Sequence, residues 1–509
     1  MLPFLNVTAK NSKKYVVSFR GINYGEECQE GEFSETKNVS TVKFPCVSQR
    51  FGRELVGSYS APTSLHTKDG LMIIDGTKAI YNGTVVGNVT VGRKQIATVG
   101  NYIIIFPDKV YYNVATKEFA SMEATISAAN MAFTDTTITT TGAAFPFRVG
   151  DAITISGCTA HPENNKTVES ALIIRGVSGN TLTFYENTFT AGTESVTVTI
   201  KRDVPDLDFL CESNYRLWGT KGNTIYSSKF MDPLNFYSYD GIVADSYAIS
   251  VGSDGEFTGC VPFSSHICFF KENTLHKLYG SKPSNFQIVT SQVYGVQEGS
   301  ERSICTINET LFYKGVGGVY AYTGGVPELV STKFGTRKFS DACAATDGSV
   351  YYLSMREGSV WHVFAYDVRR NMWMHEDNTH CVDMSFHDGY VYFLTEEGQL
   401  LRVDSSVDQK DIEWSVTFCP FNETVNERKG YSKFHMRLEL GAGSTLAVEM
   451  KRNVDVDWQQ IYSTHNEKAR TISIPVIPAR CDSVEIRLSG KGECLLRTFI
   501  REFFTGSDV

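Results

Sequence analysis

Two histidines lie close together in the sequence, in a pattern that could bind a metal ion. His375 and His380 enclose Glu376 and Asp377, and Cys381 follows directly. A zinc protease helix places its two histidines four residues apart, so that both rings share one face. His375 and His380 are five apart and stand in a polar connector between apolar runs. We therefore interpret this segment as a loop at the edge of a sheet, and not as a set of ligands.

Asp455 and Asp457 could bind calcium, because a calcium loop begins with alternating carboxylates. Such a loop also needs a glycine turn and a later glutamate. Neither follows here. The pattern favours the tip of a β-hairpin.

Three glycine-containing segments resemble catalytic motifs in part. Ser253–Phe257 and Asp388–Tyr390 are the nearest matches to the Ser-x-Asp-x-Gly-x-x-Trp box of sialidase-type propellers, but their Asp-Gly pairs are typical of hairpin turns. Gly315–Gly318 lacks the Lys-Ser/Thr and the helix of a phosphate-binding loop, which favours a turn. No spacing pairs the carboxylates that a glycosidase needs. We assign no catalytic, cofactor-binding or metal-binding residue and expect no cofactor.

Seven segments share one pattern, in which two runs of β-branched or aromatic residues flank a polar turn. This pattern predicts β-hairpins. The segments are 70–81, 102–112, 216–226, 267–279, 311–320, 350–364 and 390–401. From Ile267 onward they recur about every 40 residues, which is the period of a four-stranded propeller blade. The sequence therefore predicts an all-β fold with a β-propeller of six to eight blades, whose first strands complete a blade begun near its C-terminal end.

Segments with other sequence patterns interrupt and flank the hairpins, and these changes of pattern divide the chain into four regions. Residues 1–60 are irregular and glycine-containing, and we expect an extended segment that wraps the body. The propeller occupies 60–119 and 209–404. Residues 120–208 form an inserted small β-barrel or sandwich with a return linker, and its ends should lie close together. Within this insert we expect two hairpins, at 147–157 and 173–184, the second with its turn at Ser178-Gly179-Asn180.

The C-terminal region, 405–509, carries longer alternating strands that predict an antiparallel β-sandwich, autonomous over 412–509. Its apolar residues alternate with charged ones at period two, so they should point inward. These inward residues are Trp414, Phe434, Met436, Leu438, Leu440, Ile472, Ile474, Val484, Ile486 and Leu488.

Composition restricts the class of partner. The net charge is −9, and no run of Lys or Arg exceeds two residues. Proteins that hold nucleic acid through its phosphates normally carry a basic patch, so stable DNA binding is not expected, whereas an acidic surface that DNA slides past is compatible with this charge. No signal peptide opens the chain, and no stretch reaches 18 apolar residues, so we expect no export by a cleaved signal and no membrane-spanning segment.

The cysteines are expected to be reduced. None forms a Cys-x-x-Cys pair, and most stand inside apolar runs, where cysteine behaves as a small hydrophobic residue. Buried free thiols suit folding in a reducing cytosol. The twelve are Cys28, Cys46, Cys158, Cys211, Cys260, Cys268, Cys305, Cys343, Cys381, Cys419, Cys481 and Cys494.

Over Ile225–Phe236 a strand leads into Asp-Pro-Leu-Asn-Phe. The hairpin 267–279, Gly280–Phe286 and Gly299–Ile304 follow. In this order the segments resemble the propeller proteins at the head–tail junction and tail of tailed bacteriophages, the packaged-DNA stabilisation or tail nozzle family, and Ile225–Phe236 is the most specific stretch. The similarity covers 210–405 well and 15–55 more weakly. In the weaker region it rests on Gly31–Asn38, followed by Pro45 and Arg50. The insert and the C-terminal sandwich depart from the compact family pattern.

The resemblance implies a structural virion protein, not an enzyme, made in the bacterial cytoplasm and located at the head–tail connector or tail. It would form a ring-shaped homo-oligomer, with six-fold symmetry as the first expectation, in contact with neighbouring connector and tail proteins. The ring would surround the DNA path and help to retain and release the genome. The alternatives are a host-recognition protein of the tail tip that binds glycans and, as a minor one, a propeller glycan hydrolase.

The charge adds an expectation about the DNA path. Each phosphate contact from Lys or Arg would slow ejection. We therefore expect channel-facing positions rich in Asp, Glu, Ser, Thr and Asn, with isolated basic residues at most. Duplex DNA would pass transiently, without specific binding, and a narrow bore or a partner plug would retain it.

Overall fold

The computed structural model describes residues 10–407, 410–424, 426–453, 457–465 and 470–505. Regular structure in these ranges is almost entirely β-strand, and the fold is a β-propeller with an inserted small β-domain and a C-terminal β-sandwich, which confirms the predicted fold class. The described residues contain no α-helix. Their helical turns are the short 3-10 elements η1 (Pro162–Asn164), η2 (Val168–Ser170), η3 (Pro283–Asn285), η4 (Glu301–Ser303) and η5 (Thr332–Phe334). Among these residues, no helix has the length and apolar character needed to cross a membrane.

The chain forms two compact units, residues 60–301 and residues 1–59 with 302–509. Each of the seven predicted hairpins forms the two middle strands of a four-stranded antiparallel sheet, so the described residues contain seven blades. Four blades lie in 60–301. Their strands are β6 (Pro62–Thr67), β7 (Leu71–Asp75), β8 (Lys78–Tyr81) and β9 (Thr84–Asn88); β10 (Gln95–Val99), β11 (Tyr102–Phe106), β12 (Val110–Asn113) and β13 (Glu118–Ser121); β23 (Phe209–Ser213), β24 (Arg216–Lys221), β25 (Thr224–Ser227) and β26 (Tyr247–Ser250); β27 (Gly259–Phe263), β28 (His266–Lys271), β29 (Thr274–Tyr279) and β30 (Gln287–Gln292).

The other three blades belong to the unit of 1–59 and 302–509. In the last of them, β5 pairs with β41 as the outermost strand, so an N-terminal strand completes the C-terminal blade as predicted. The strands are β31 (Cys305–Ile307), β32 (Thr310–Gly315), β33 (Gly318–Tyr322) and β34 (Glu328–Leu329); β35 (Ser340–Thr346), β36 (Val350–Glu357), β37 (Val360–Asp367) and β38 (Met372–Asp377); β39 (Cys381–His387), β40 (Tyr390–Thr395), β41 (Gln399–Asp404) and β5 (Gly52–Ser58).

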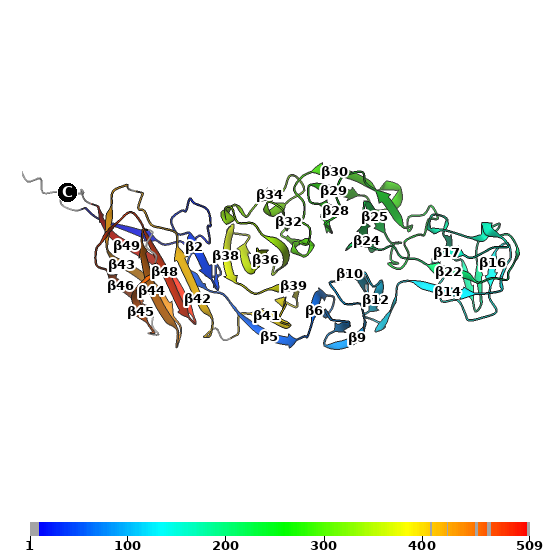
Figure 1. The fold of residues 1–509 in the computed structure, drawn as a ribbon, viewed down its shortest axis with the longest axis horizontal. Coiled ribbons are helices and arrows are strands. Elements are labelled where there is room, and N and C mark those ends of the chain that lie inside the picture. The colour runs from blue at the N-terminus through cyan, green and yellow to red at the C-terminus, as the bar shows by residue number, and fades with distance from the viewer. Residues whose placement is uncertain (1–9, 408–409, 425, 454–456, 466–469, 506–509) are drawn as a thin grey trace, which may run out of the picture. The chain divides into compact units, whose positions relative to one another are not determined.

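The insert consists of two small sheets around one apolar core. One has the order β14-β22-β17-β18 and the other β19-β20-β16-β15-β21. Its ends do lie together, because Ala124 of β14 pairs with Arg202 of β22 (Figure 1). The strands are β14 (Ala124–Ala128), β15 (Met131–Phe133), β16 (Thr137–Thr139), β17 (Ala152–Ser156), β18 (Leu172–Ile173), β19 (Gly176–Ser178), β20 (Thr181–Thr183), β21 (Gly192–Glu194) and β22 (Val198–Arg202).

The two hairpins predicted inside the insert have different outcomes. β19 and β20 form a hairpin whose turn includes Gly179 at a φ of 56°, as predicted. The prediction of a hairpin over 147–157 is wrong. β17 pairs instead with β18 and with β22, because only the later half of this segment has the apolar alternation of a strand.

The segment Ile225–Phe236, which carries the family resemblance, fastens the insert to its blade. Asn235 donates to Asp151 Oδ1 across 3.1 Å and accepts the N–H of Ala152 across 3.0 Å. Asp151 in turn accepts from the buried Arg202 guanidinium across 2.8 Å. These contacts satisfy polar groups that burial would otherwise penalise, so the Asn235–Asp151–Arg202 chain fixes the insert on the β23–β26 blade.

The sandwich contains strands from both ends of the described chain. One sheet has the order β3-β4-β49-β43-β46, with β1 on β49 and β47 on β43, and the other has the order β2-β42-β48-β44-β45. Figure 1 shows β2 beside β42. The strands are β1 (Lys10–Val16), β2 (Phe33–Lys37), β3 (Val39–Ser40), β4 (Val47–Gln49), β42 (Glu413–Phe418), β43 (Lys429–Leu440), β44 (Thr445–Arg452), β45 (Gln459–Thr464), β46 (Arg470–Pro475), β47 (Arg480–Cys481), β48 (Val484–Lys491) and β49 (Cys494–Thr505).

This pairing differs from the expectation that 412–509 forms the sandwich by itself. Residues 10–49 supply four strands, because β42 and β49 would otherwise expose unpaired edges. The inward side chains were nevertheless predicted correctly. All ten, from Trp414 to Leu488, are buried in one core together with Phe19 and Phe33 of the N-terminal segment.

The cysteine prediction is wrong for one pair. Cys28 and Cys419 form a disulfide across a sequence separation of 391 residues. The N-terminal segment brings them together, since Phe33 pairs with Phe418 and the N–H of Cys419 donates to Glu32. The other ten cysteines are free thiols, and eight of them are buried.

Candidate functional site: an acidic cleft between two blades

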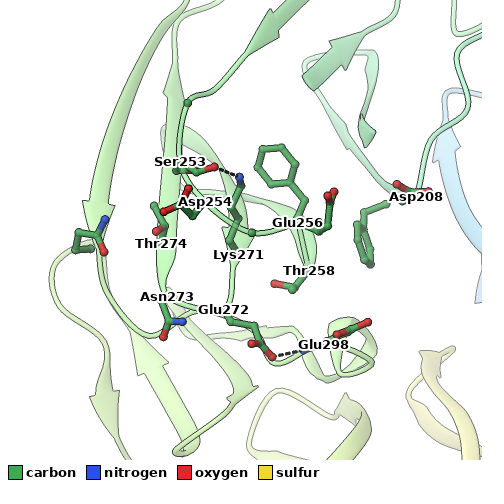
Figure 2. Close-up of a pocket in the computed structure, with 15 residues that line it drawn as sticks. Asp208, Ser253, Asp254, Glu256, Thr258, Lys271, Glu272, Asn273, Thr274 and Glu298 are labelled. Atoms are coloured by element: carbon green, nitrogen blue, oxygen red, sulfur yellow. Dashed lines mark hydrogen bonds between the residues drawn. The ribbon is translucent and has the colours of Figure 1, made fainter. Parts of the chain in front are cut away.

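A cleft of about 1080 Å³ opens between the β23–β26 and β27–β30 blades (Figure 2). Its walls come from the start of β23, the loop between β26 and β27, the turn between β28 and β29, and the residues after β30. These segments meet because antiparallel strands return the chain to the same end of a blade at every second turn. The lining residues are Asp208, Phe209, Gly252, Ser253, Asp254, Gly255, Glu256, Phe257, Thr258, Lys271, Glu272, Asn273, Thr274, Gln292 and Glu298.

Negative charge dominates the lining. Five of these residues are carboxylates, and Lys271 is the single basic one among them. Glu272 accepts the backbone N–H of Glu298 across 3.1 Å, which joins two of the walls (Figure 2). Asp208 pairs with Lys221 across 2.9 Å at the rim, where both side chains are about half exposed. Exposed pairs of this kind contribute little to stability.

The ammonium of Lys271 is buried at the base of the cleft and its donors are engaged within the protein. Nζ donates to Asn223 Oδ1 across 2.6 Å and to the backbone oxygen of Ser253 across 2.7 Å. It also lies 5.0 Å from the ring centre of Phe257. Burial lowers the pKa of Lys271, and Glu256 and Asp254 oppose this decrease. The side chain therefore holds the loop, and Figure 2 shows it extending toward Ser253.

Ser253 and His276 form a pair that resembles part of a nucleophilic site. The Ser253 hydroxyl lies 2.8 Å from His276 Nε2, and the other ring nitrogen lies 2.9 Å from Thr290 Oγ1. A catalytic triad needs a carboxylate at that second nitrogen to stabilise the imidazolium. Burial lowers the pKa of His276 to about 4, and Lys271 adds to the decrease. Thr290 stands where a triad would have a carboxylate, and the imidazole is a weak base. We therefore interpret the Ser253–His276 contact as a structural hydrogen bond and not as a nucleophilic site.

The cleft can repel polyanions and accept polar or cationic groups. Among the described residues, no three His, Cys, Asp or Glu side chains are grouped so that they could hold a metal ion. The carboxylates instead act together as a negative surface, whose field is strongest where low-dielectric walls surround it.

Of the three glycine-containing segments considered as catalytic motifs, Ser253–Phe257 lines this cleft. The sequence pattern indicated a hairpin turn, and this is wrong. Gly255, at a φ of 80°, lies in the loop that joins β26 of one blade to β27 of the next. The other two glycine motifs are hairpin turns as predicted. Asp388 and Gly389 join β39 to β40, both with positive φ, and the Gly315–Gly318 segment joins β32 to β33.

The structure separates His375 and His380. His375 lies in strand β38, not in a loop, which corrects the prediction for this residue. Its Nδ1 is 3.0 Å from the backbone oxygen of Thr36 and its Nε2 is 3.1 Å from His362 Nδ1. His380 stacks on Trp361 with 3.9 Å between ring centres.

The other candidate metal pair lies partly beyond the described residues. Asp455 lies outside them, whereas Asp457 is exposed at the start of the segment that leads into β45. β44 and β45 pair antiparallel on either side.

Lys271 and His276 were not singled out from the sequence. Both stand inside the predicted hairpin 267–279, where alternation indicates only that a side chain faces one side of a strand. Their partners Ser253, Asn223 and Thr290 come from three other segments, so no local spacing connects them. The Asp-Gly pair in 253–257 was the single sequence feature that pointed to a residue range of this cleft. It predicted a turn but not where in the blade the turn lies.

Comparison with known proteins gives a similarity of fold only. No family model matches the chain, and no curated protein matches it. Among solved structures, Hsv2 from Kluyveromyces marxianus is similar at 11% identity and a TM-score of 0.27, over 42% of this chain and 65% of Hsv2. An exo-β-1,3-galactanase from Phanerochaete chrysosporium has 9% identity and a TM-score of 0.22, over 56% of this chain and 92% of the enzyme. The N-terminal domain of Nup159 has 10% identity and a TM-score of 0.24, over 76% of this chain and 98% of that domain. Similarities at these values carry no argument about activity.

Proposed function

We propose that this chain is a structural virion protein of a tailed phage, which forms a ring at the head–tail connector or tail around the DNA path. The observation that carries the proposal is the acidic cleft. Its lining matches the composition expected of a surface that faces DNA without holding it. Five carboxylates, hydroxyl and amide side chains, and one buried lysine make up its polar part.

The electrostatic argument concerns ejection. A duplex held by Lys or Arg must regain its counterions as each phosphate contact breaks, so every such contact adds a barrier. Lys271 cannot act in this way, because Asn223 and Ser253 already occupy its ammonium. Facing the path, Asp254 and Glu256 would let the duplex pass, while a narrow bore or a plug from a partner retains it.

The proposed partners are further copies of the chain and the neighbouring connector and tail proteins. The test is co-expression with the products of the adjacent genes, followed by electron microscopy of the purified assemblies. A ring with a central channel is expected, together with no detectable binding of duplex DNA at physiological salt. Monomers that never assemble, or tight DNA binding, would contradict the proposal.

A glycan-binding role at the tail tip is the second candidate, and a groove on the sandwich favours it. The groove has about 790 Å³ and lies along the β2-β42-β48-β44-β45 sheet. Ser415, Thr464 and Ser489 line it with hydroxyl groups, next to Arg487 and Glu449. A glycan array would test this role. Binding that the groove-filling variant Ser489→Trp abolishes would support recognition, and an array without any hit would exclude it.

A further inference from the structure

A second, smaller cavity lies at the opposite end of the same two blades. Its volume is about 160 Å³, room for about five waters at about 30 Å³ each. It is formed where β23 turns into β24, β27 turns into β28, and β29 leads toward β30. The lining residues are Ser213, Asn214, Arg216, Trp218, Ser264, Ser265, His266, Ile267, Leu278, Gly280, Ser281 and Phe286. We call it the Arg216 cavity.

The charge of the Arg216 cavity is opposite to that of the acidic cleft. None of the described residues that line it is a carboxylate, although the chain as a whole has a net charge of −9. Arg216 is the charged residue in the lining, and four serine hydroxyls and an asparagine amide accompany it. Hydroxyl and amide donors around one guanidinium are the groups that recognise oxyanions.

Arg216 is only 1% exposed, and most of its donors hold a neighbouring loop. Its NH1 donates to the backbone oxygens of Ser228 and Asp245, and its NH2 donates to that of Val243. These carbonyl groups supply dipoles but no net negative charge. The Nε–H is buried, and no described residue accepts it. A buried guanidinium with an unused donor carries a desolvation cost that an anion would offset.

The nearest acidic influence does not fill this role. Burial lowers the pKa of Arg216, and Asp245 opposes the decrease. The Asp245 carboxylate, however, accepts the backbone N–H groups of Asp240, Gly241 and Ile242 through Oδ2, at 2.6–2.9 Å. Oδ2 is committed to the loop, and Oδ1 is buried without a hydrogen-bond partner among the described residues. Asp245 forms no ion pair with Arg216 in the described part of the chain, so the Nε donor of Arg216 stays unused.

We propose that the Arg216 cavity binds a small oxyanion, a phosphate group or a carboxylate, with one oxygen accepting the Nε–H of Arg216. The serines at the mouth, Ser264, Ser265 and Ser281, are exposed and can donate to the other oxygens. This site lies apart from the acidic cleft and is independent of the proposed virion role.

The test is calorimetric titration of the full chain with inorganic phosphate and, separately, with acetate, at constant ionic strength in chloride buffer. We expect saturable binding of one anion per chain and a rise in melting temperature of about 2–4 °C near saturation. Phosphate binding without acetate binding would identify a phosphate site, and the reverse would identify a carboxylate site. Absence of saturable binding by both anions would overturn the proposal.

Two matched variants locate the site. Ser281→Asp places a carboxylate at the mouth and should weaken anion affinity by about tenfold or more, because like charges repel at close range. Ser284→Asp adds the same charge in the same turn, but Ser284 does not line the cavity, so its affinity should match wild type. Equal affinity in wild type and Ser281→Asp would refute the assignment. These variants leave Arg216 in place, so the loop that it holds is not disturbed.

Discussion

The guanidinium of Arg53 donates to the carboxylate of Glu376 across 2.6 Å, and both side chains are at most 6% exposed. Arg53 stands on β5, which completes the last blade, and Glu376 stands on β38 of the neighbouring blade. Asp377 accepts from the same guanidinium across 2.8 Å. We predict that Arg53→Ala lowers the free energy of unfolding by about 3–5 kcal/mol, because the buried Glu376 loses its closest partner and the more distant Arg50 replaces it only in part. Urea denaturation measures it.

The control for this prediction is Lys37→Ala. Lys37 pairs with Glu413 across 3.5 Å, but these side chains are 49% and 72% exposed. Its loss should change the free energy of unfolding by less than about 1 kcal/mol. Equal effects of the two substitutions would show that burial of the Arg53 pair does not matter.

The pair His362 and His375 predicts an acid-sensitive stability. Since Thr36 O can only accept, His375 Nδ1 carries the proton, so His362 Nδ1 donates to His375 Nε2 and His362 Nε2 is unprotonated. Burial, together with the nearby His375 and Arg337, lowers the pKa of His362 to about 4, although Glu357 opposes the decrease. The unfolded histidine has a pKa of about 6.5, so its contribution is complete above that pH and is lost as the pH falls toward 4.

We therefore expect the free energy of unfolding to decrease from about pH 7 to about pH 5, and the decrease to be smaller in His362→Gln. Urea titrations at both pH values measure this. The exposed His465 provides the control, since His465→Gln should keep the wild-type difference. An unchanged pH dependence in His362→Gln would remove His362 from the explanation.

The disulfide predicts a defined thiol count. Ten of the twelve cysteines should react with a thiol reagent after denaturation without reductant, and all twelve after reduction. Cys28→Ser should lower the free energy of unfolding by about 2–5 kcal/mol. Cys46→Ser, which removes a partly exposed free thiol, should have little effect. A count of twelve before reduction would contradict the Cys28–Cys419 bond.

Leu438 tests the sandwich core. It is 2% exposed and packs among the buried residues of both sheets. Leu438→Asp should lower the free energy of unfolding by several kcal/mol, because it buries an unpaired carboxylate. The same change at the adjacent outward position, Arg437→Asp, should be tolerated. Equal melting of Leu438→Asp and wild type would disprove the inward assignment.

The acidic cleft predicts a gain of DNA binding on charge reversal. The double variant Asp254→Lys, Glu256→Lys should bind duplex DNA measurably, with an affinity that falls as salt rises, because two new cations can contact phosphates. Wild type should show no binding under the same conditions. The matched control Asp388→Lys, Glu397→Lys adds equal charge at residues that do not line the cleft. If the control variant gains the same DNA affinity, the change in net charge alone explains the binding and the position of the cleft does not matter.

Local chemistry made the blades predictable. Asp388 and Gly389 adopt φ values of 48° and 84°, the conformation that two-residue hairpin turns require, so the residue types alone indicated the turn. The ten inward residues of the sandwich were predictable in the same way, since a strand repeats every two residues. Such signals depend only on neighbours in the chain.

Contacts between segments that are distant in the sequence could not be predicted from residue types or from period-two alternation. Cys28 and Cys419, or Arg53 and Glu376, lie hundreds of residues apart, and neither partner has a periodic pattern that indicates the other. The acidic cleft was missed for the same reason. Its walls come from separate turns, and their meeting follows from which end of each blade a turn occupies.

The participation of β1–β4 and β42–β49 in one sandwich has a consequence for biosynthesis. β2 is synthesised well before β49, so β1 to β4 wait for roughly 20–90 s at ordinary elongation rates before their partner is made. A nascent chain that stops before β49 keeps the edges of β1 and β4 without their partner. Until β49 is made, these edges are open to pairing with other chains, so the folding of the sandwich and its exposure to aggregation depend on strands far apart in the sequence.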